Sequence, residues 1–287
     1  MEISLQEVTF AYQAAGRQWP VLKDINLRVA PGDFLAITGA GGSGKSTLAM
    51  LLAGLLEPVS GRVTLNGQPV RGRGKGIGKG LSLWQKVGMV FQQPEQQLFA
   101  ETVAEDIAFG PRNMGLPADQ VGVRVKAALR AVGLDPDGLG GRSPFTLSGG
   151  QQRRVAIAGI LALEPEVLIL DEPTAGLDPA GRAGIIKLIR AFCQQPARAV
   201  VLISHNMADV AELARQVVVL HQGRVALQGT PREIFRQGEA LRSYGLLPPS
   251  WTRLMQGLHR QGAPVPLDVL NLAEARDAIL AWLGGGG

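Results

Sequence analysis

The sequence has 287 residues, 46% hydrophobic and 18% charged, which excludes a mainly disordered chain and allows one large core with a small appendix. Its net charge of +5 is compatible with binding to nucleic acid, anionic lipid or nucleotide phosphates, and does not discriminate among these partners. The single cysteine, Cys193, excludes an intrachain disulfide, and its apolar neighbours at helical spacing predict a packed thiol. No apolar run reaches the ~18 residues of a membrane span, so we expect any membrane role to depend on a partner.

The N-terminal part alternates strand-like runs with turns, and one helix lies among them. The runs at 3–10 and 21–29 are typical of an antiparallel edge sheet. The apolar run at 33–38 ends at a glycine-rich turn, after which a helix is predicted over 46–56. A further strand at 62–65 ends at an Asn-Gly pair, which is typical of tight hairpin turns.

The middle of the chain changes to helical periodicity. Apolar residues recur at helical spacing over 118–132, and a second helix follows Ser148, which predicts a helical insert over about 92–165. Beyond this insert, three apolar, β-branched runs separated by helices are typical of buried parallel strands. These runs cover residues 166–170, 199–204 and 216–220.

The end of the chain has weaker patterning, which we interpret as a linker and a small helical appendix. A Leu-Leu-Pro-Pro stretch at 246–249 forms the linker, and 251–258 and 272–283 are amphipathic helices. The glycine run at 284–287 should be disordered. A second glycine-rich stretch, at 71–80, also contains Lys and Arg, and is either a flexible solvated loop or an anion-binding patch.

One glycine-rich segment matches the P-loop pattern G-x-x-x-x-G-K-[ST], after a predicted strand and at the start of a helix, as the pattern requires. Its glycines let successive backbone N–H groups point at phosphates, which predicts binding of ATP with Mg²⁺. Lys45 is suited to neutralise the β- and γ-phosphates, and Ser46 to ligate magnesium. A chance glycine-rich turn is the alternative. The segment and the residue after it are Gly39, Ala40, Gly41, Gly42, Ser43, Gly44, Lys45, Ser46 and Thr47.

Two adjacent acids follow a later apolar run. The strand predicted at 167–170 ends in Asp171 and Glu172, and the carboxyl ends of strands are where open α/β sheets bind ligands. We expect Asp171 to hold magnesium, through water, and Glu172 to polarise the attacking water as general base. A strand that merely ends in two surface acids is the alternative, and the P-loop in the same chain argues against it.

A Leu-Ser-Gly-Gly-Gln string, here called the signature loop, precedes another predicted helix. Ser148, Gly149, Gly150 and Gln151 offer a hydroxyl group and bare backbone N–H groups at the positive end of that helix. By itself the string is either a second phosphate-binding device or an ordinary helix cap.

The order of these motifs resembles the ATPase domain of ABC transporters over residues 1–240. The resemblance implies an α/β P-loop NTPase core with an antiparallel β edge subdomain, a helical subdomain and a small C-terminal helical appendix. It also implies head-to-tail dimers, in which ATP lies between one P-loop and the partner's signature loop, and the loop at 175–178 contacts the opposite subunit.

The resemblance also implies roles for three single residues. Tyr12 would stack on adenine, Gln92 would sense magnesium and the γ-phosphate, and His205 would contact the γ-phosphate. A plain edge-strand aromatic and a structural histidine are the alternatives for Tyr12 and His205.

Segments at 90–99, 101–111 and 152–159 narrow the resemblance to energy-coupling factor (ECF) importers, and most closely to the second of their two ATPase subunits. This implies a second ATPase subunit, an ECF transmembrane coupling subunit and, indirectly, a membrane-embedded subunit that binds vitamins or transition-metal ions. It places the chain at the cytoplasmic face of the membrane. Residues 241–287 would be a dimerisation region, and no nucleic-acid partner is expected.

Gly42 and the glycine-rich basic stretch at 71–80 depart from the family's pattern, and Glu95 carries a separate prediction. Gly42 stands where these ATPases commonly carry Asn or Thr, which keeps the backbone cradle but removes a side-chain contact. Glu95, near Gln92, either binds an arginine of the transmembrane subunit or is a solvated loop acid.

Other functions compete with the ECF reading. They are an ATPase of another ABC transporter type, a soluble ABC ATPase acting on nucleic acid or ribosomes, and a non-hydrolysing regulatory subunit. Glu172 and His205 argue against the regulatory subunit, and the lack of a long coiled-coil insert argues against the soluble ATPase. The sequence leaves open the cargo, the choice between homodimer and heterodimer, and whether two composite sites are equally active.

Overall fold

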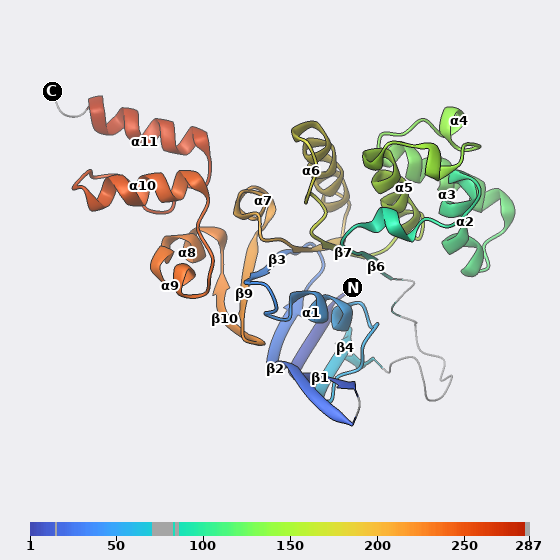
Figure 1. Cartoon of the computed structure of the whole chain (residues 1–287), viewed down its shortest axis with the longest axis horizontal. Coiled ribbons are helices and arrows are strands. Elements are labelled where there is room, and N and C mark those ends of the chain that lie inside the picture. Colours follow the sequence, from blue (N-terminus) through green and yellow to red (C-terminus); the bar gives the residue numbers. More distant parts are fainter. Residues whose placement is uncertain (15, 71–82, 84–85, 285–287) are drawn as a thin grey trace.

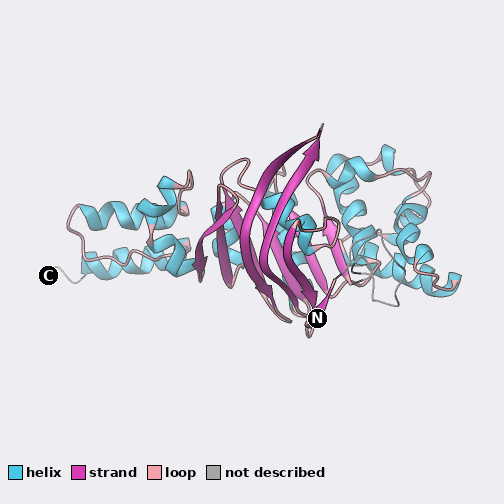
Figure 2. Cartoon of the chain, turned by 90° about the horizontal axis from the view of Figure 1, so that it is seen from below, coloured by secondary structure: helices cyan, strands magenta, loops and turns pink. Residues whose placement is uncertain are grey.

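The computed structural model describes residues 1–14, 16–70, 83 and 86–284. The predicted basic loop at 71–80 and residues 285–287 of the glycine run lie outside the described residues. Figure 2 shows the strands in the middle of an elongated molecule, with one group of helices beyond each end of the sheets. One group of helices lies between strands of the second sheet and the other group follows that sheet, as the sequence predicts.

The first sheet is antiparallel, with the strand order β2-β1-β4-β5. Its long strands β1 (Ile3–Ala14) and β2 (Arg17–Val29) extend beyond the predicted limits, and β4 (Ser60–Leu65) pairs with the other side of β1. The short β5 (Gln68–Pro69) follows a turn in which Asn66 and Gly67 have φ values of 49° and 78°. Two successive positive φ angles are the conformation that the Asn-Gly pair predicts.

The second sheet holds the predicted buried strands and has the order β10-β9-β3-β8-β7-β6. All of its neighbours pair in parallel except β10, which runs antiparallel to β9. The half-exposed β10 has a mixed polar sequence, so periodicity did not predict it. The strands are β3 (Phe34–Gly39), β6 (Val87–Val90), β7 (Val167–Asp171), β8 (Ala199–Ile203), β9 (Gln216–His221) and β10 (Arg224–Gly229).

Each parallel strand separates two cores, because successive side chains point to opposite faces of the sheet. On β7, Leu168 and Leu170 pack toward the helices, whereas Val167 and Ile169 pack toward the antiparallel sheet and the helix α1 (Lys45–Leu52). The helices α6 (Pro179–Cys193) and α7 (Met207–Leu213) connect the later strands (Figure 1). This two-sided burial holds the strand ends, and the loops that follow them, in fixed positions.

Cys193 ends α6 and packs against the helix-side core. Burial raises the pKa of its thiol to about 11, so the side chain is a thiol rather than a thiolate at neutral pH. This agrees with the prediction of a packed, unreactive cysteine.

The helical segment between the two halves of the parallel sheet contains more helices than periodicity predicted. The predicted helices are α3 (Ala118–Ala131) and α5 (Gly149–Leu161). A further helix, α2 (Val103–Asn113), was not predicted from periodicity, and its N-cap Thr102 accepts a hydrogen bond from Glu105 N. Short turns complete the segment: 3₁₀ turns at Pro94–Gln97 and Pro144–Thr146, and α4 at Pro136–Leu139.

The C-terminal region begins with α8 (Pro231–Arg236) and α9 (Gly238–Ser243), which the sequence analysis did not predict. The predicted pair follows as α10 (Ser250–Arg260) and α11 (Leu272–Gly284), which lie side by side in Figure 1 and share a small core around Met255. The expected boundary between residues 240 and 241 falls inside α9. Gly284, predicted to be disordered, is the last residue of α11. Within the described residues, no helix has the length and apolar character needed to cross a membrane.

Candidate nucleotide-binding site

Four parallel strands bring the predicted site residues to one edge of the sheet. The strands β3, β8, β7 and β6 are successive neighbours, so their carboxyl ends lie in a row. The P-loop follows β3, His205 follows β8, Glu172 follows β7 and Gln92 follows β6. Their pairing aligns Val90 with Leu170, so Gln92 and Glu172 stand the same number of residues beyond the paired ends. The sheet thus brings together residues from four distant parts of the sequence.

Two glycines of the P-loop, Gly39 and Gly44, are required by the backbone. Gly39 has a φ of 155°, and a Cβ at this position would lie 2.3 Å from the carbonyl oxygen of Leu220. Gly44 has a φ of 102°, and its Cβ would lie 2.7 Å from the side chain of Leu22. Gly42 has a φ of 75° with open space around it. This left-handed conformation suits Gly or Asn, so Gly42 keeps the loop geometry without the side chain common in related ATPases.

Lys45 lies across the loop that precedes it. Its Nζ donates hydrogen bonds of 2.9 Å to the carbonyl oxygens of Gly39 and Ala40. Burial lowers the pKa of this ammonium group, and the carboxylates of Glu172 and Asp171 oppose that shift. The cation is therefore positioned at the mouth of the loop, beside the two acids.

Asp171 and Ser46 provide the oxygen ligands expected for magnesium. Burial raises the pKa of the Asp171 carboxyl group, and this shift is opposed by a hydrogen bond with Ser46 and by the charge of Lys45. Among the described residues, no group of three or more His, Cys, Asp or Glu side chains is placed to hold a metal ion. One carboxylate and one hydroxyl group fit Mg²⁺, which is usually bound by few protein ligands together with water and substrate phosphates.

Glu172 and His205 form a hydrogen-bonded pair. Glu172 Oε1 accepts from the backbone N of His205 at 3.0 Å and from His205 Nδ1 at 2.7 Å. Donation from Nδ1 leaves Nε2 of this exposed ring to face a ligand. Glu172 has a φ of 50°, an uncommon conformation for a non-glycine residue that is typical of functional sites.

Tyr12 lies next to the start of α1. Its hydroxyl group is 3.3 Å from Thr47 Oγ1, and its ring packs edge-on against Phe10 at a centroid distance of 4.9 Å. The side chain remains 39% exposed, so part of the ring is accessible beside the P-loop. In the P-loop itself, Ser43 Oγ is buried and has no hydrogen-bond partner within the described part of the chain.

The signature loop lies apart from the P-loop of its own chain. Ser148 and Gln151 form a capping box at the start of α5, with Ser148 Oγ accepting from Gln151 N at 3.3 Å. Ser148 and Gly150 line a cavity of about 500 Å³ together with Gly176 and Asp178 from the loop after Glu172. The P-loop borders a different cavity, of about 480 Å³. The string is therefore a helix cap, as one alternative predicted, and also borders a cavity that the P-loop does not reach.

The P-loop cavity has a wall that the sequence analysis missed. Besides Gly39, Ala40 and Gly41, its lining includes His205 and the segment 245–253, which contains the predicted linker. A Cβ on Gly245 would lie 3.6 Å from Cβ of Ala40. The Pro-Pro pair signalled a linker, but no local pattern indicates which loop a linker contacts.

The alternative that Glu95 is a solvated loop acid is wrong, and its contact with an arginine of the transmembrane subunit stays a prediction. Its carboxylate is held within the chain by Arg153 of α5, with Nε–Oε2 and Nη2–Oε1 distances of 3.0 and 3.3 Å. Arg153 also donates to the carbonyl oxygen of Ala175 at 2.7 Å. Its side chain is only 8% exposed. The arginine thus joins three segments: the one after Gln92, the helix after the signature loop, and the loop after Glu172.

Replacing Glu95 with Ala should destabilise the isolated chain. Arg153 would keep a nearly buried charge without its carboxylate partner. Removal of one member of a buried pair typically costs about 3–5 kcal/mol, and because the Glu95 side chain is 25% exposed we expect a loss of about 2–4 kcal/mol of unfolding free energy. Denaturant unfolding measures this loss. Glu101→Ala, at an exposed acid nearby, is the matched control and should change stability by less than about 0.5 kcal/mol. Equal stabilities of the two variants would contradict this role of Glu95.

A P-loop lysine, an acid pair at the end of a neighbouring strand, and a separate signature loop before a helix together define an ATPase of the ABC class. The family profile of ABC transporters matches residues 22–175. The energy-coupling factor transporter ATP-binding protein EcfA2 of Caldanaerobacter subterraneus subsp. tengcongensis is 46% identical, over 99% of both chains. The chain therefore belongs to the ABC transporter family, as an ATP-binding subunit of the energy-coupling factor type.

Solved structures agree with this assignment. The structure of cbiO1 from Clostridium perfringens, part of the ABC transporter complex cbiONQ, matches with a TM-score of 0.72 and 38% identity, covering 91% of this chain and 98% of that one. The ATP-binding cassette MJ0796, solved as a dimer in a post-hydrolysis state with ADP and Pi, matches with a TM-score of 0.68 and 27% identity, covering 79% and 98%. The predicted fold class, the ATPase activity and the binding of ATP with Mg²⁺ are confirmed.

Proposed function

We propose that this chain pairs head to tail with a second ATPase subunit, and that each ATP is hydrolysed between the P-loop of one subunit and the signature loop of the other. The observation that carries this proposal is the separation of the two loops: Ser148 and Gly150 border one cavity, and the P-loop borders another. A single chain therefore holds two separate half-sites. The dimeric state of the cassette MJ0796 supports the same arrangement.

Within each composite site, we propose that catalysis depends on positioning and on neutralising the charge of the phosphates. Lys45 would contact the β- and γ-phosphates, and Ser46, Asp171 and Gln92 would hold Mg²⁺, which neutralises the charge that develops during phosphoryl transfer. Tyr12 would stack on adenine with the accessible part of its ring. Backbone N–H groups of residues 39–47 would bind the phosphates in one subunit, and Ser148–Gln151 would contact the γ-phosphate from the other.

Water activation would fall to Glu172. Its carboxylate already accepts two hydrogen bonds from His205, which fix its direction at the edge of the sheet. As general base, Glu172 would take a proton from the attacking water, and His205 Nε2 would contact the γ-phosphate. The loop at 175–178, which shares the signature-loop cavity, would contact the partner subunit.

We propose that the ATPase pair drives an ECF importer from the cytoplasmic face of the membrane. Phe99, in the segment after Gln92, and Phe109, on α2, pack edge-on at 5.0 Å and are 60% and 51% exposed. This aromatic pair offers apolar contact to the helices of a transmembrane coupling subunit. The cargo would be a vitamin or a transition-metal ion bound by a separate membrane-embedded subunit. We do not propose a nucleic-acid partner.

We also propose that residues 241–287 contribute to dimerisation. The outer surface of the α10–α11 pair carries exposed apolar side chains, among them Leu254, Leu280 and Leu283. Burial of such side chains in the second subunit would add contact area outside the nucleotide sites.

Purification of the intact complex tests this function. A tagged chain, extracted from its own membranes in mild detergent, should bring down a second ATPase and a polytopic membrane subunit, and the complex should release phosphate from MgATP. A Phe99→Glu variant should lose the membrane subunit but still bind MgATP, because Phe99 lies outside the P-loop cavity. Recovery of the chain with ribosomes or DNA, and without membrane subunits, would contradict the proposal.

A further inference from the structure

A buried carboxylate, Asp209, lies behind the catalytic pair and belongs to no motif identified in the sequence. It stands on the first turn of α7, the helix that begins two residues after His205, and is 1% exposed. A buried charge is costly unless it is paired and hydrogen-bonded. Its contacts are therefore informative about what it holds in place.

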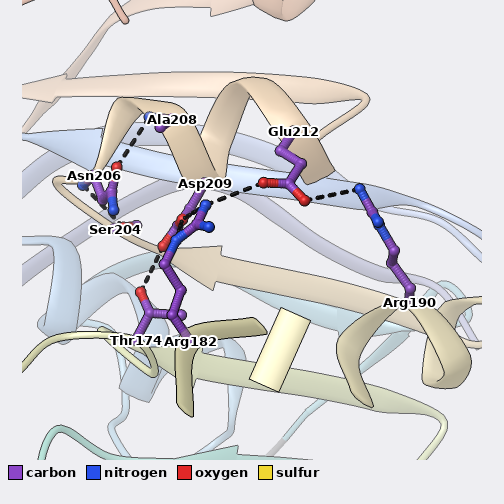
Figure 3. Close-up of polar contacts among 8 residues, drawn as sticks. All are labelled: Thr174, Arg182, Arg190, Ser204, Asn206, Ala208, Asp209 and Glu212. Carbon is purple, nitrogen blue, oxygen red and sulfur yellow. Dashed lines mark hydrogen bonds and ion pairs between the residues drawn. The ribbon is translucent and has the colours of Figure 1, made fainter. Parts of the chain in front are cut away.

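Asp209 is bonded to both segments that flank the loop after Glu172. Thr174 Oγ1 donates to Asp209 Oδ2 at 2.5 Å, and Arg182 Nε donates to Asp209 Oδ1 at 2.7 Å. Thr174 lies two residues after Glu172, and Arg182 lies on the first turn of α6. Figure 3 shows all three side chains converging from different elements. One carboxylate thus ties the helix after His205 to both ends of the loop that follows Glu172.

From Arg182 the polar contacts continue to the surface. Arg182 Nη2 donates to Glu212 at 3.0 Å, and Arg190 Nη2 donates to the other oxygen of Glu212 at 2.9 Å (Figure 3). The side chain of Arg190 is 55% exposed. Exposed ion pairs contribute little to stability. We therefore expect the contacts of Asp209 with Thr174 and Arg182 to affect catalysis, and the contact of Arg190 with Glu212 to have no effect.

The catalytic pair needs such support from behind. Glu172 has an uncommon positive φ and His205 lies in the short connection between β8 and α7. On the strand side, Glu172 N bonds to Ile203 O at 3.0 Å, and Asn206 N bonds to Ser204 Oγ at 3.0 Å. These bonds fix the start of each loop. The Asp209 contacts fix the far side, where each loop leads into its helix.

We propose that Asp209, through Thr174 and Arg182, is a positioning residue that holds the Glu172–His205 pair in register during ATP hydrolysis. It is buried and does not line the P-loop cavity, so it acts through the two loops that carry the pair. The inference rests on the proposed roles of Glu172 and His205. It also gives a physical route between the two half-sites of one chain, because α6 begins at the signature-loop cavity and α7 begins at the P-loop cavity.

Thr174 offers the sharpest test, because Val has nearly its shape without the hydroxyl group. In the purified complex, Thr174→Val should lower kcat for MgATP hydrolysis roughly 10-fold, since small misplacements of catalytic groups have effects of this size. KM for ATP should change by less than about threefold, because the P-loop is untouched. Thr174→Ser keeps the hydroxyl group and should restore most of kcat. Asp209→Asn should lower kcat further, by roughly 10²-fold.

Two control variants show whether a negative result contradicts the positioning role alone or the proposed function as well. Arg190→Gln, at the exposed end of the same contacts, should keep wild-type kcat. Glu172→Gln should lower kcat by roughly 10²–10⁴-fold; near-normal turnover would contradict the proposed role of Glu172, on which this inference rests. If Glu172→Gln is inactive while Thr174→Val keeps wild-type kcat, only the positioning role is wrong. The positioning role would also be overturned if Thr174→Ser lowered kcat as much as Thr174→Val does. It would likewise be overturned if kcat fell only in those variants whose melting temperature also fell.

Discussion

Glu172→Gln should bind MgATP as tightly as the wild-type chain and lose nearly all turnover. Glu172 is positioned by His205 at the carboxyl end of β7, and glutamine keeps its size while losing the base. General-base catalysis typically contributes roughly 10²–10⁴-fold, so kcat in the assembled complex should fall by that factor. Phosphate release measures turnover, and titration with ATP measures binding. The variant should also accumulate as a closed, ATP-bound dimer, which size-exclusion chromatography would detect.

Glu166→Gln is the matched control for this substitution. Glu166 stands directly before β7, at its amino end, where it pairs with Lys86 at 2.5 Å rather than with the site. Its replacement should leave kcat within about twofold of wild type, since a half-exposed ion pair contributes about 0–1 kcal/mol. Near-normal turnover in Glu172→Gln would remove Glu172 from the role of general base.

Ser148→Arg should have an effect of similar size, but on the ATP held by the other subunit. The arginine would enter the cavity that Ser148 and Gly150 border and would remove the contact of the signature loop with the partner's nucleotide. We expect hydrolysis at that site to fall by roughly 10²–10³-fold, the size seen when one donor to a transition-state oxyanion is lost. Binding of ATP to this chain's own P-loop should not change.

Ser148→Ala separates the loss of a contact from the added bulk. Alanine removes the N-cap of α5 and the hydroxyl group, which costs about 1 kcal/mol of stability and leaves the Gly149 and Gly150 N–H groups in place. Its effect on hydrolysis should therefore be smaller than that of Ser148→Arg. Nucleotide trapping counted separately at the two sites would show which one each variant affects.

Local patterns were sufficient to predict the P-loop and most strands of the two sheets, but not β5, β6 or β10. The parallel strands β7 and β8 are continuous apolar runs, and Gly39 and Gly44 of the P-loop have positive φ angles and close contacts that only glycine accommodates. Both features depend on only a few neighbouring residues, so they can be recognised in the sequence. The pair Asp171–Glu172 was predicted for the same reason, because it ends a recognisable strand.

Contacts between distant segments were not predictable in this way. Glu95 and Arg153 are separated by 58 residues, and nothing in either segment indicates that they pair. Thr174 and Asp209 are likewise brought together only by the packing of α6 and α7 around neighbouring strands. The approach of segment 245–253 to the P-loop depends on how α8 and α9 pack, because these helices set where the segment that follows them begins. Such contacts arise from tertiary structure, and periodicity carries no record of them.

The most direct measurement compares two complexes that each carry two lesions. In the split complex, this chain carries Lys45→Ala and the second ATPase carries arginine at its signature serine. In the combined complex, this chain carries both Lys45→Ala and Ser148→Arg. Each is tested for ADP trapped with MgATP and vanadate. Because a composite site joins one P-loop to the other subunit's signature loop, the split complex should keep one working site and trap nucleotide there. The combined complex should trap none; trapping by the combined complex and none by the split complex would contradict the head-to-tail arrangement.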